Sequence, residues 1–143
     1  MPPPMADRDC IALGIRQPWA ELILRGHKTI EVRTQPTARR GVIYLYASRT
    51  RSDRPEALAA AAAHGIDVES LPAGVLVGQV EIIDSTPCTT ADGADACLPP
   101  SLLKGRHGWR LKNPRRLSEP LPVRFLPYGI WFYPFKRLNG SNR

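Results

Sequence analysis

The chain has 143 residues, 43% of them hydrophobic, and a formal net charge of +7 at pH 7. This length predicts a single domain, and the hydrophobic content suffices for a core of its own. The excess of Lys and Arg favours an anionic partner, nucleic acid first, although a generally basic soluble protein would carry the same charge.

The two ends of the chain lack the periodicity of regular structure. We expect a disordered leader over residues 1–9, a folded domain over 10–136 and a flexible tail over 137–143. The start has no signal-peptide pattern, and no segment is long and apolar enough to span a bilayer. The three cysteines and three histidines are spaced neither for a metal site nor for a disulfide framework. We therefore expect a cytoplasmic protein with reduced thiols and no metal, cofactor or membrane contact.

A strand and a short helix begin the domain. Apolar residues alternate over residues 8–15, which predicts a strand. Pro18 suits the first turn of a helix, and Gly26 suits the left-handed position just past its end. The apolar residues from Trp19 to Ile23 fall on one face of this helix, and we expect that face to be buried.

A charged strand follows the helix directly. If residues 27–34 are extended, Glu31 and Arg33 point to one side and the apolar residues to the other. Lys28 lies beside the glycine turn, so three polar groups meet at one helix-to-strand corner. Two interpretations stay open: an ion pair on a solvated sheet face, or a binding or catalytic corner.

The remaining pattern predicts further strands and a second helix. The strands are expected at residues 41–48, 75–84, 107–111, 121–125 and 129–135, and the helix at 53–63. An Asp53-x-x-Glu56 capping box begins that helix. Residues 86–101 lack periodicity and predict a long loop, and residues 112–117, which contain Asn-Pro, predict a basic turn. The fold class is α+β, a small curled mixed sheet or barrel of about six strands with helices at its rim.

The run IRQPWAELILRGHKTIEVRT resembles the opening of the ASCH domain, a member of the PUA-like superfamily. The family hallmark Gly-x-Lys-x-x-Glu-x-Arg corresponds to Gly26, Lys28, Glu31 and Arg33. Further matches, such as GWRLKNPRRL, are to the single-domain bacterial form. The resemblance implies a PUA-like mixed β-barrel with a cleft lined by the hallmark Lys, Glu and Arg. It also implies nucleic-acid binding, with RNA, another single-stranded nucleic acid or a modified nucleoside as the partner.

In this hypothesis one base enters the corner at Lys28 and basic loops hold phosphates. An exposed Trp or Tyr would stack a base, although we expect Trp19 and Trp131 in the core. The candidate binding residues outside the hallmark are Arg16, Gln17, Arg39, Arg40, Ser48, Arg49, Lys112, Arg115 and Arg116.

Two other functions remain open. Small ASCH proteins include amidohydrolases that act on N4-acylated cytidine with a Lys, a Thr three residues later and a distant Glu. Lys28 matches the Lys, but Glu31 stands at the Thr position. Thr29, as a nucleophile that Lys28 would activate as a base, and Glu81 are the nearby candidates. In a ribonuclease, Lys28 and Arg33 would stabilise the phosphorane and Glu31 would be the base. The third function is a protein-interaction module, which an exposed apolar patch, for example over residues 132–135, would support.

Overall fold

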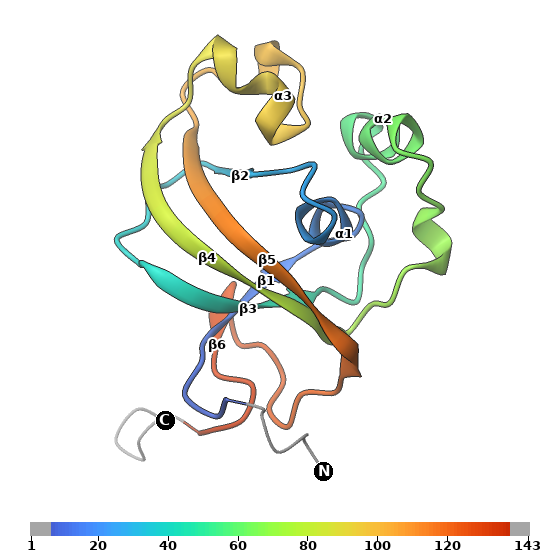
Figure 1. The fold of residues 1–143 in the computed structure, drawn as a ribbon, viewed down its shortest axis with the longest axis vertical. Helices are drawn as coiled ribbons and strands as arrows, with labels where there is room; N and C mark the ends of the chain where they lie inside the picture. The colour runs from blue at the N-terminus through green and yellow to red at the C-terminus, as the bar shows by residue number, and fades with distance from the viewer. Residues whose placement is uncertain (1–6, 138–143) are drawn as a thin grey trace.

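A computed structural model describes residues 7–137 of the chain and shows one curled six-stranded sheet with helices along its rim (Figure 1). The strands are β1 (Ala12–Ile15), β2 (Ile30–Arg33), β3 (Gly41–Ala47), β4 (Val75–Pro87), β5 (His107–Leu121) and β6 (Trp131–Phe132). The α-helices are α1 (Trp19–Leu24), α2 (Pro55–Ala63) and α3 (Gly93–Ala96). Three short 3₁₀ helices cover Val68–Ser70, Thr90–Asp92 and Pro100–Leu102.

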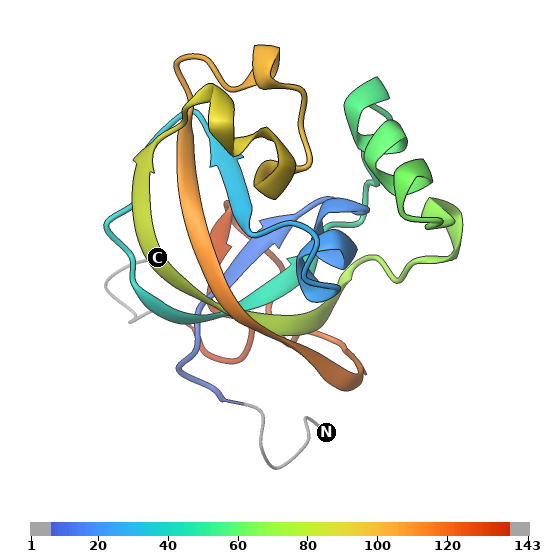
Figure 2. The same ribbon diagram turned by 45° about the horizontal axis from the view of Figure 1, so that its top comes forward.

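The sheet is mixed, and its strand order is β2-β5-β4-β3-β1-β6. β1 runs parallel to β3, and every other neighbouring pair is antiparallel. The long strands β4 and β5 bend strongly along their length (Figure 2). Their pairing shifts register at three places, and such bulges bend and twist a strand pair. The fold is therefore α+β, as the sequence predicted.

The predicted barrel is wrong in one respect, because the sheet does not close. Within residues 7–137, the edge strands β2 and β6 do not pair with each other. Among the described residues these strands, of four and two residues, pair with β5 and β1 respectively. Side chains cross the gap instead: the Arg33 guanidinium donates to the carbonyl of Gly14 at 3.2 Å, and the rings of Trp109 and Trp131 stack 5.8 Å apart.

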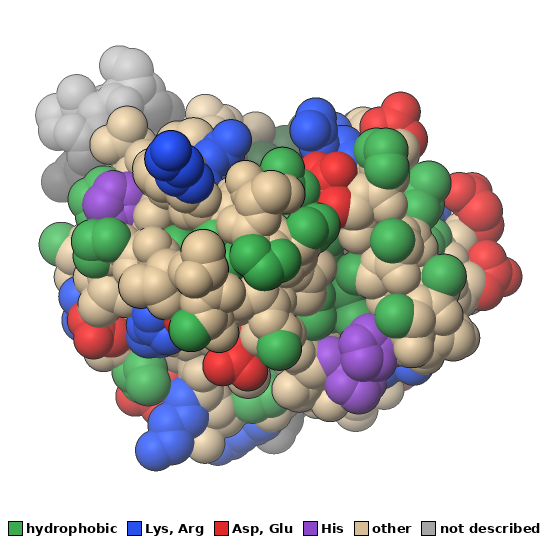
Figure 3. All heavy atoms as spheres, turned by 90° about the horizontal axis from the view of Figure 1, so that it is seen from above, with side chains coloured by type: hydrophobic (Ala, Val, Ile, Leu, Met, Phe, Trp, Pro, Cys, Tyr) green, Lys and Arg blue, Asp and Glu red, His purple; other side chains and the backbone are tan. Residues whose placement is uncertain are grey.

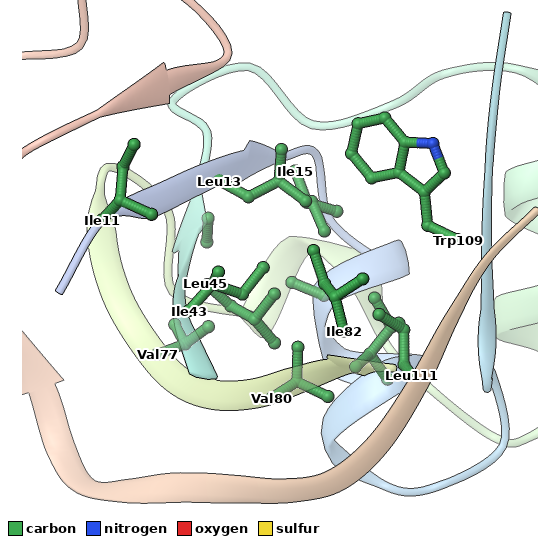
Figure 4. Close-up of a cluster of buried hydrophobic side chains, with 13 residues drawn as sticks. Ile11, Leu13, Ile15, Ile43, Leu45, Val77, Val80, Ile82, Trp109 and Leu111 are labelled. Atoms are coloured by element: carbon green, nitrogen blue, oxygen red, sulfur yellow. The ribbon is translucent and has the colours of Figure 1, made fainter. Parts of the chain in front are cut away.

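The main hydrophobic core fills the inside of the curl (Figure 4). It joins side chains of β1, β3, β4 and β5, and α1 adds Ala20 and Ile23. α1 also packs against β4 and β5 at Gly78, where a Cβ would lie 2.4 Å from the Leu24 side chain and 2.5 Å from the Arg115 carbonyl oxygen. Only glycine allows this approach, which fixes the helix that leads to the charged strand.

Residues 112–117 do not form the predicted basic turn but lie in the middle of β5. Their backbone pairs with β4, which gives these residues more hydrogen bonds than an isolated turn would. Asn113 adopts a positive φ of 55°, and the pairing with β4 shifts register between Lys112 and Arg115. The Asn-Pro signal therefore produced a bulge within a strand.

Other boundaries also differ from the prediction. Of residues 121–125, only Leu121 lies in a strand, and the last strand is confined to Trp131–Phe132. β4 continues to Pro87, and the long loop after it contains α3 and two of the 3₁₀ helices. α2 begins after Arg54, whose side chain makes no cap hydrogen bond, so the Asp53 capping box does not form.

The leader and tail predictions fall mostly on residues 1–6 and 138–143, which lie outside the described residues. Asp7, which is described, donates its N–H to the Tyr44 hydroxyl at 2.8 Å. Between residues 7 and 137, no helix has the length and apolar character needed to cross a bilayer. In the same range, no three His, Cys, Asp or Glu side chains are grouped so that they could hold a metal ion.

Candidate functional site

The corner between α1 and β2 is built by the end of the helix. Gly26 has a φ of +83°, which L residues with side chains rarely adopt. The next two backbone N–H groups, of His27 and Lys28, both donate to the Leu22 carbonyl, at 3.0 and 3.1 Å. These bonds give the Leu22 carbonyl at the helix end its hydrogen-bond partners and turn the chain sharply into β2. The left-handed Gly26 predicted from the sequence makes this turn possible. The turn brings the Lys28 side chain inside the fold.

Lys28 is buried, with 3% of its surface exposed. Its Nζ donates to the carbonyl of Ala96 in α3 at 2.6 Å and lies 4.7 Å from the centre of the Trp19 ring. Burial lowers the pKa of Lys28 below the ordinary lysine value; nearby Glu31 opposes this change, and Arg33 adds to it. Lys28 therefore holds a proton less firmly than a surface lysine.

Glu31 and Arg33 share a face of β2, as the alternation predicted. Arg33 Nε donates to Glu31 Oε2 at 2.7 Å, and Glu31 is only 7% exposed. The Arg33 guanidinium also lies 5.4 Å from the centre of the Trp109 ring. Arg33 thus holds the Glu31 carboxylate in place while it joins β2 to β1 and β5.

Lys28 and Glu31 line a cavity of about 370 Å³, which we call the Lys28 cavity. This volume lies at the small end of the range for ligand pockets, roughly 300–1,000 Å³. The apolar part of its lining consists of Trp19, Val32, Leu98 and Leu102, and the charged part of Lys28, Glu31, Arg54, Glu56 and Arg106. From above, hydrophobic side chains gather in a hollow with charged side chains near one end (Figure 3).

The cavity offers a donor and an acceptor side by side. A charged Lys28 has three N–H donors, one of which goes to Ala96. Glu31 is held by Arg33 through one carboxylate oxygen, and its other oxygen makes no hydrogen bond to the described residues. A ligand that carries both an acceptor and a donor would satisfy this pair. The edges of nucleobases have that pattern.

Arg33, the last of the three charged hallmark residues, does not line the cavity. Thr29 does not line it either: its side chain is exposed, while its backbone N–H donates to the Asp95 carbonyl at 2.8 Å. The structure therefore brings Lys28 and Glu31 together, with Arg33 behind Glu31. It does not bring Thr29 to them.

Two predicted binding residues make hydrogen bonds to other parts of the protein: Gln17 in the interior and Arg116 at the surface. Gln17 is fully buried; its Oε1 accepts from the Glu21 N–H at 2.9 Å, and its Nε2 donates to the Pro72 carbonyl at 3.1 Å. Arg116 donates twice to the Glu21 carboxylate, at 2.9 and 2.8 Å. Both residues thus brace α1 rather than face the Lys28 cavity.

The other predicted cations lie on the surface. The five that are exposed and form no ion pair within residues 7–137 are Arg16, Arg39, Arg49, Lys112 and Arg115. Arg39 lies 4.7 Å over the Trp131 ring, and Arg40 lies 3.6 Å from Asp84. Ser48 is half-buried, and its N–H donates to the Ile15 carbonyl.

The tryptophan prediction holds in part. Trp19 and Trp131, which were expected in the core, are half-buried and pack against it, and Trp19 also lines the cavity, whereas Trp109 is buried at 3% exposure. Sequence reasoning also missed Ala96, Leu98, Leu102 and Arg106, all supplied by or beside the long loop after β4. The length of that loop was the available signal, because long loops in compact domains are often functional.

Two solved structures from Zymomonas mobilis share this fold. For the crystal structure of ASCH from this organism, the TM-score is 0.60 and the match covers 94% of this chain and 91% of that one, at 15% identity. For a mutant of the same Zymomonas mobilis protein, the TM-score is 0.58 and the coverage is 93% and 90%, at 16% identity. At such low identity, the likeness establishes the fold alone.

Two curated relatives are closer in sequence but much longer. Activating signal cointegrator 1 of Mus musculus is 37% identical over 140 residues, which is 92% of this chain but 23% of that protein. Its Homo sapiens counterpart is 35% identical over 79 residues, or 50% of this chain and 14% of that protein. The likeness therefore concerns one part of each relative.

The family model of the ASCH domain matches residues 13–120. That range contains α1, β2 and every residue of the Lys28 cavity. This chain belongs to the ASCH domain family.

Proposed function

We propose that this ASCH domain binds RNA, or a single modified nucleotide, by taking one base into the Lys28 cavity. The observation that carries the proposal is the pairing of a buried donor, Lys28, with a buried acceptor, Glu31, in a cavity small enough for one base. Buried polar groups of this kind discriminate strongly, because a ligand that leaves either one unpaired is penalised.

Charge supports an anionic polymer as the partner. The chain carries a net charge of +7, and Arg16, Arg49, Lys112 and Arg115 are exposed without acidic partners within residues 7–137. Guanidinium and ammonium groups on such a surface attract phosphates and release counterions. These four cations would hold the backbone of a strand whose base lies in the cavity.

Titration of the protein with labelled single-stranded RNA at two salt concentrations tests this proposal. With about four phosphate contacts, affinity should fall roughly 10–50-fold between about 50 and 200 mM salt. Replacing the exposed cations one at a time should weaken binding and flatten this dependence. Affinity that barely changes with salt would contradict phosphate contacts.

Hydrolysis is a second candidate, and one observation favours it. Because burial lowers the pKa of Lys28, more of this amine is neutral near physiological pH than in a surface lysine. A neutral amine can accept a proton from an attacking water. The resemblance to small ASCH amidohydrolases then suggests N4-acylated cytidine, whose amide bond would be cleaved to cytidine and a carboxylate; the ribonuclease alternative would act on single-stranded RNA.

Incubation of wild type and Lys28→Met with N4-acetylcytidine and with RNA, followed by product analysis, separates an enzyme from a binder. Cleavage by wild type alone would establish the hydrolase. Binding without cleavage would leave the first proposal standing and remove the second.

A protein-interaction role has less support. Phe132 and Phe135, which were to form the exposed patch, are buried at 0% and 5% exposure. The likeness to the single-domain bacterial form and the cytoplasmic location stay predictions.

A further inference from the structure

The mouth of the Lys28 cavity carries two arginines from segments far apart in the sequence. Arg54 is the N-cap residue of α2, and Arg106 directly precedes β5. In both ribbon views α2 stands on one side of the upper part of the molecule and the loop before β5 on the other (Figures 1 and 2). Both arginines line the cavity, so a ligand inside it would lie beside them.

Only one of these arginines lacks an acidic partner within residues 7–137. Arg54 Nε forms an ion pair with Glu56 at 2.7 Å, and Glu56 also lines the cavity. Arg106 is exposed and has no acidic partner within residues 7–137. Deeper inside, Glu31 pairs with Arg33 at 2.7 Å, and Lys28 is buried against the Ala96 carbonyl and the Trp19 ring. Arg106 is therefore the exposed guanidinium of the cavity lining that has no acidic partner within residues 7–137.

A second cavity beside the Lys28 cavity carries no such positive charge from the described residues. This second cavity, of about 630 Å³, shares Glu56 and Leu98 with the Lys28 cavity and extends past α2 and α3 to His27 and His64. Among residues 7–137, neither a Lys nor an Arg lines this second cavity. An anionic group attached to a base in the Lys28 cavity therefore finds its counter-charge at Arg106, not along the second hollow.

We infer that the ligand of the Lys28 cavity is a nucleotide, whose phosphate Arg106 binds at the mouth, and not an uncharged nucleoside. A guanidinium matches phosphate geometry with two parallel N–H donors, which suits Arg106 better than a lysine for this task. The inference rests on the proposed function and adds to it a phosphate position that none of the predicted basic segments contains.

Binding of the four common ribonucleosides, of N4-acetylcytidine and of the 5′-monophosphates of all five to wild type, measured by calorimetry, tests the inference. For the base that binds best, the monophosphate should bind at least ~10-fold more tightly than the nucleoside, as expected for a charged hydrogen-bond pair. In Arg106→Gln the ratio between the two affinities should fall to about one, because the guanidinium that binds the phosphate is lost.

Lys104→Gln is the matched control. Lys104 lies two residues away, is exposed and does not line the cavity, so its loss should leave the ratio between the two affinities unchanged. Equal affinity of nucleoside and monophosphate for wild type would overturn the inference and leave the base cavity intact. So would an Arg106→Gln variant that weakens both ligands equally. Failure of every nucleoside and monophosphate to bind would overturn the base cavity as well.

Discussion

Two clusters of this domain each place a buried glutamate against arginine, yet they differ in what surrounds the carboxylate. Glu21 in α1 accepts hydrogen bonds from both Arg25 and Arg116. Glu31 in β2 accepts from Arg33 alone among the described residues and faces a cavity beside a buried lysine. The first cluster is closed by its own side chains, and the second leaves donor and acceptor capacity for a ligand.

The difference also appears in the titration of the two clusters. Burial by itself would raise the pKa of Glu21, but the hydrogen bonds from Arg116 and Arg25 lower it below its usual value. At Lys28 burial prevails and lowers the pKa of the amine. The Glu21 cluster thus stabilises its charge, whereas the Lys28 cavity holds a charge that the fold disfavours. Such a group is a candidate for function.

The largest expected effect comes from a substitution that disrupts the Glu21 cluster. Glu21→Ala removes the acceptor of two arginines and the link from α1 to β5, and we expect a loss of about 2 kcal/mol of unfolding free energy. Urea denaturation measures this loss. RNA affinity of the folded variant should stay within about twofold, and a large loss of affinity would place Glu21 in the binding surface.

Lys28→Met should keep the stability of the fold but weaken RNA binding, which is the opposite of Glu21→Ala. The apolar side chain avoids the cost of burying an amine, so stability should stay equal or rise. Affinity for RNA should fall ~10-fold, because the donor in the cavity is lost. Thermal unfolding and RNA titration of the same sample give both numbers. A marked loss of stability with unchanged affinity would reduce Lys28 to a structural residue.

The two clusters should also respond to opposite ends of the pH scale. The folded-state pKa of Lys28 lies below the ordinary value of 10.5, so the unfolded chain binds more protons between these values. Wild type should therefore gain stability relative to Lys28→Met as pH rises through this window, by at most about 1.4 kcal/mol per pH unit.

Glu21 gives a dependence of the same sign, but in the acidic range. Its folded-state pKa lies below the ordinary 4.5, so its contribution is present above that value and is lost as pH falls through the folded-state pKa. Denaturation of wild type, Lys28→Met and Glu21→Gln across pH separates the two windows. Parallel curves for wild type and Lys28→Met above neutral pH would contradict a lowered pKa of Lys28.

Thr29→Ala should have the smallest effect. Its side chain is exposed and does not line the Lys28 cavity, so affinity, and any hydrolysis, should stay within about twofold of wild type. A loss of hydrolysis comparable to that of Lys28→Met would restore Thr29 as the nucleophile predicted from the sequence.

Local patterns predicted the α1–β2 corner well. Gly26 and the alternation of Glu31 and Arg33 depend on neighbours within a few residues, and the structure confirms both. The pattern at residues 112–117 misled because pairing with β4 turned a local turn signal into a bulge.

The walls of the cavity could not be predicted in the same way. Ala96 and Arg106 reach Lys28 or its cavity from far along the chain, through a loop without periodicity. The position of an arginine at the mouth depends on how α2 and that loop pack. The spacing of residues along the chain does not encode this packing. The same limit applies to Gln17 and Arg116, whose partners around Glu21 are visible only in three dimensions.

A crystal structure of the domain with bound single-stranded RNA tests the central claim most directly. We predict one base inside the Lys28 cavity, within hydrogen-bond distance of Lys28 Nζ and the Glu31 carboxylate. RNA bound elsewhere on the surface, with the cavity empty, would contradict this claim.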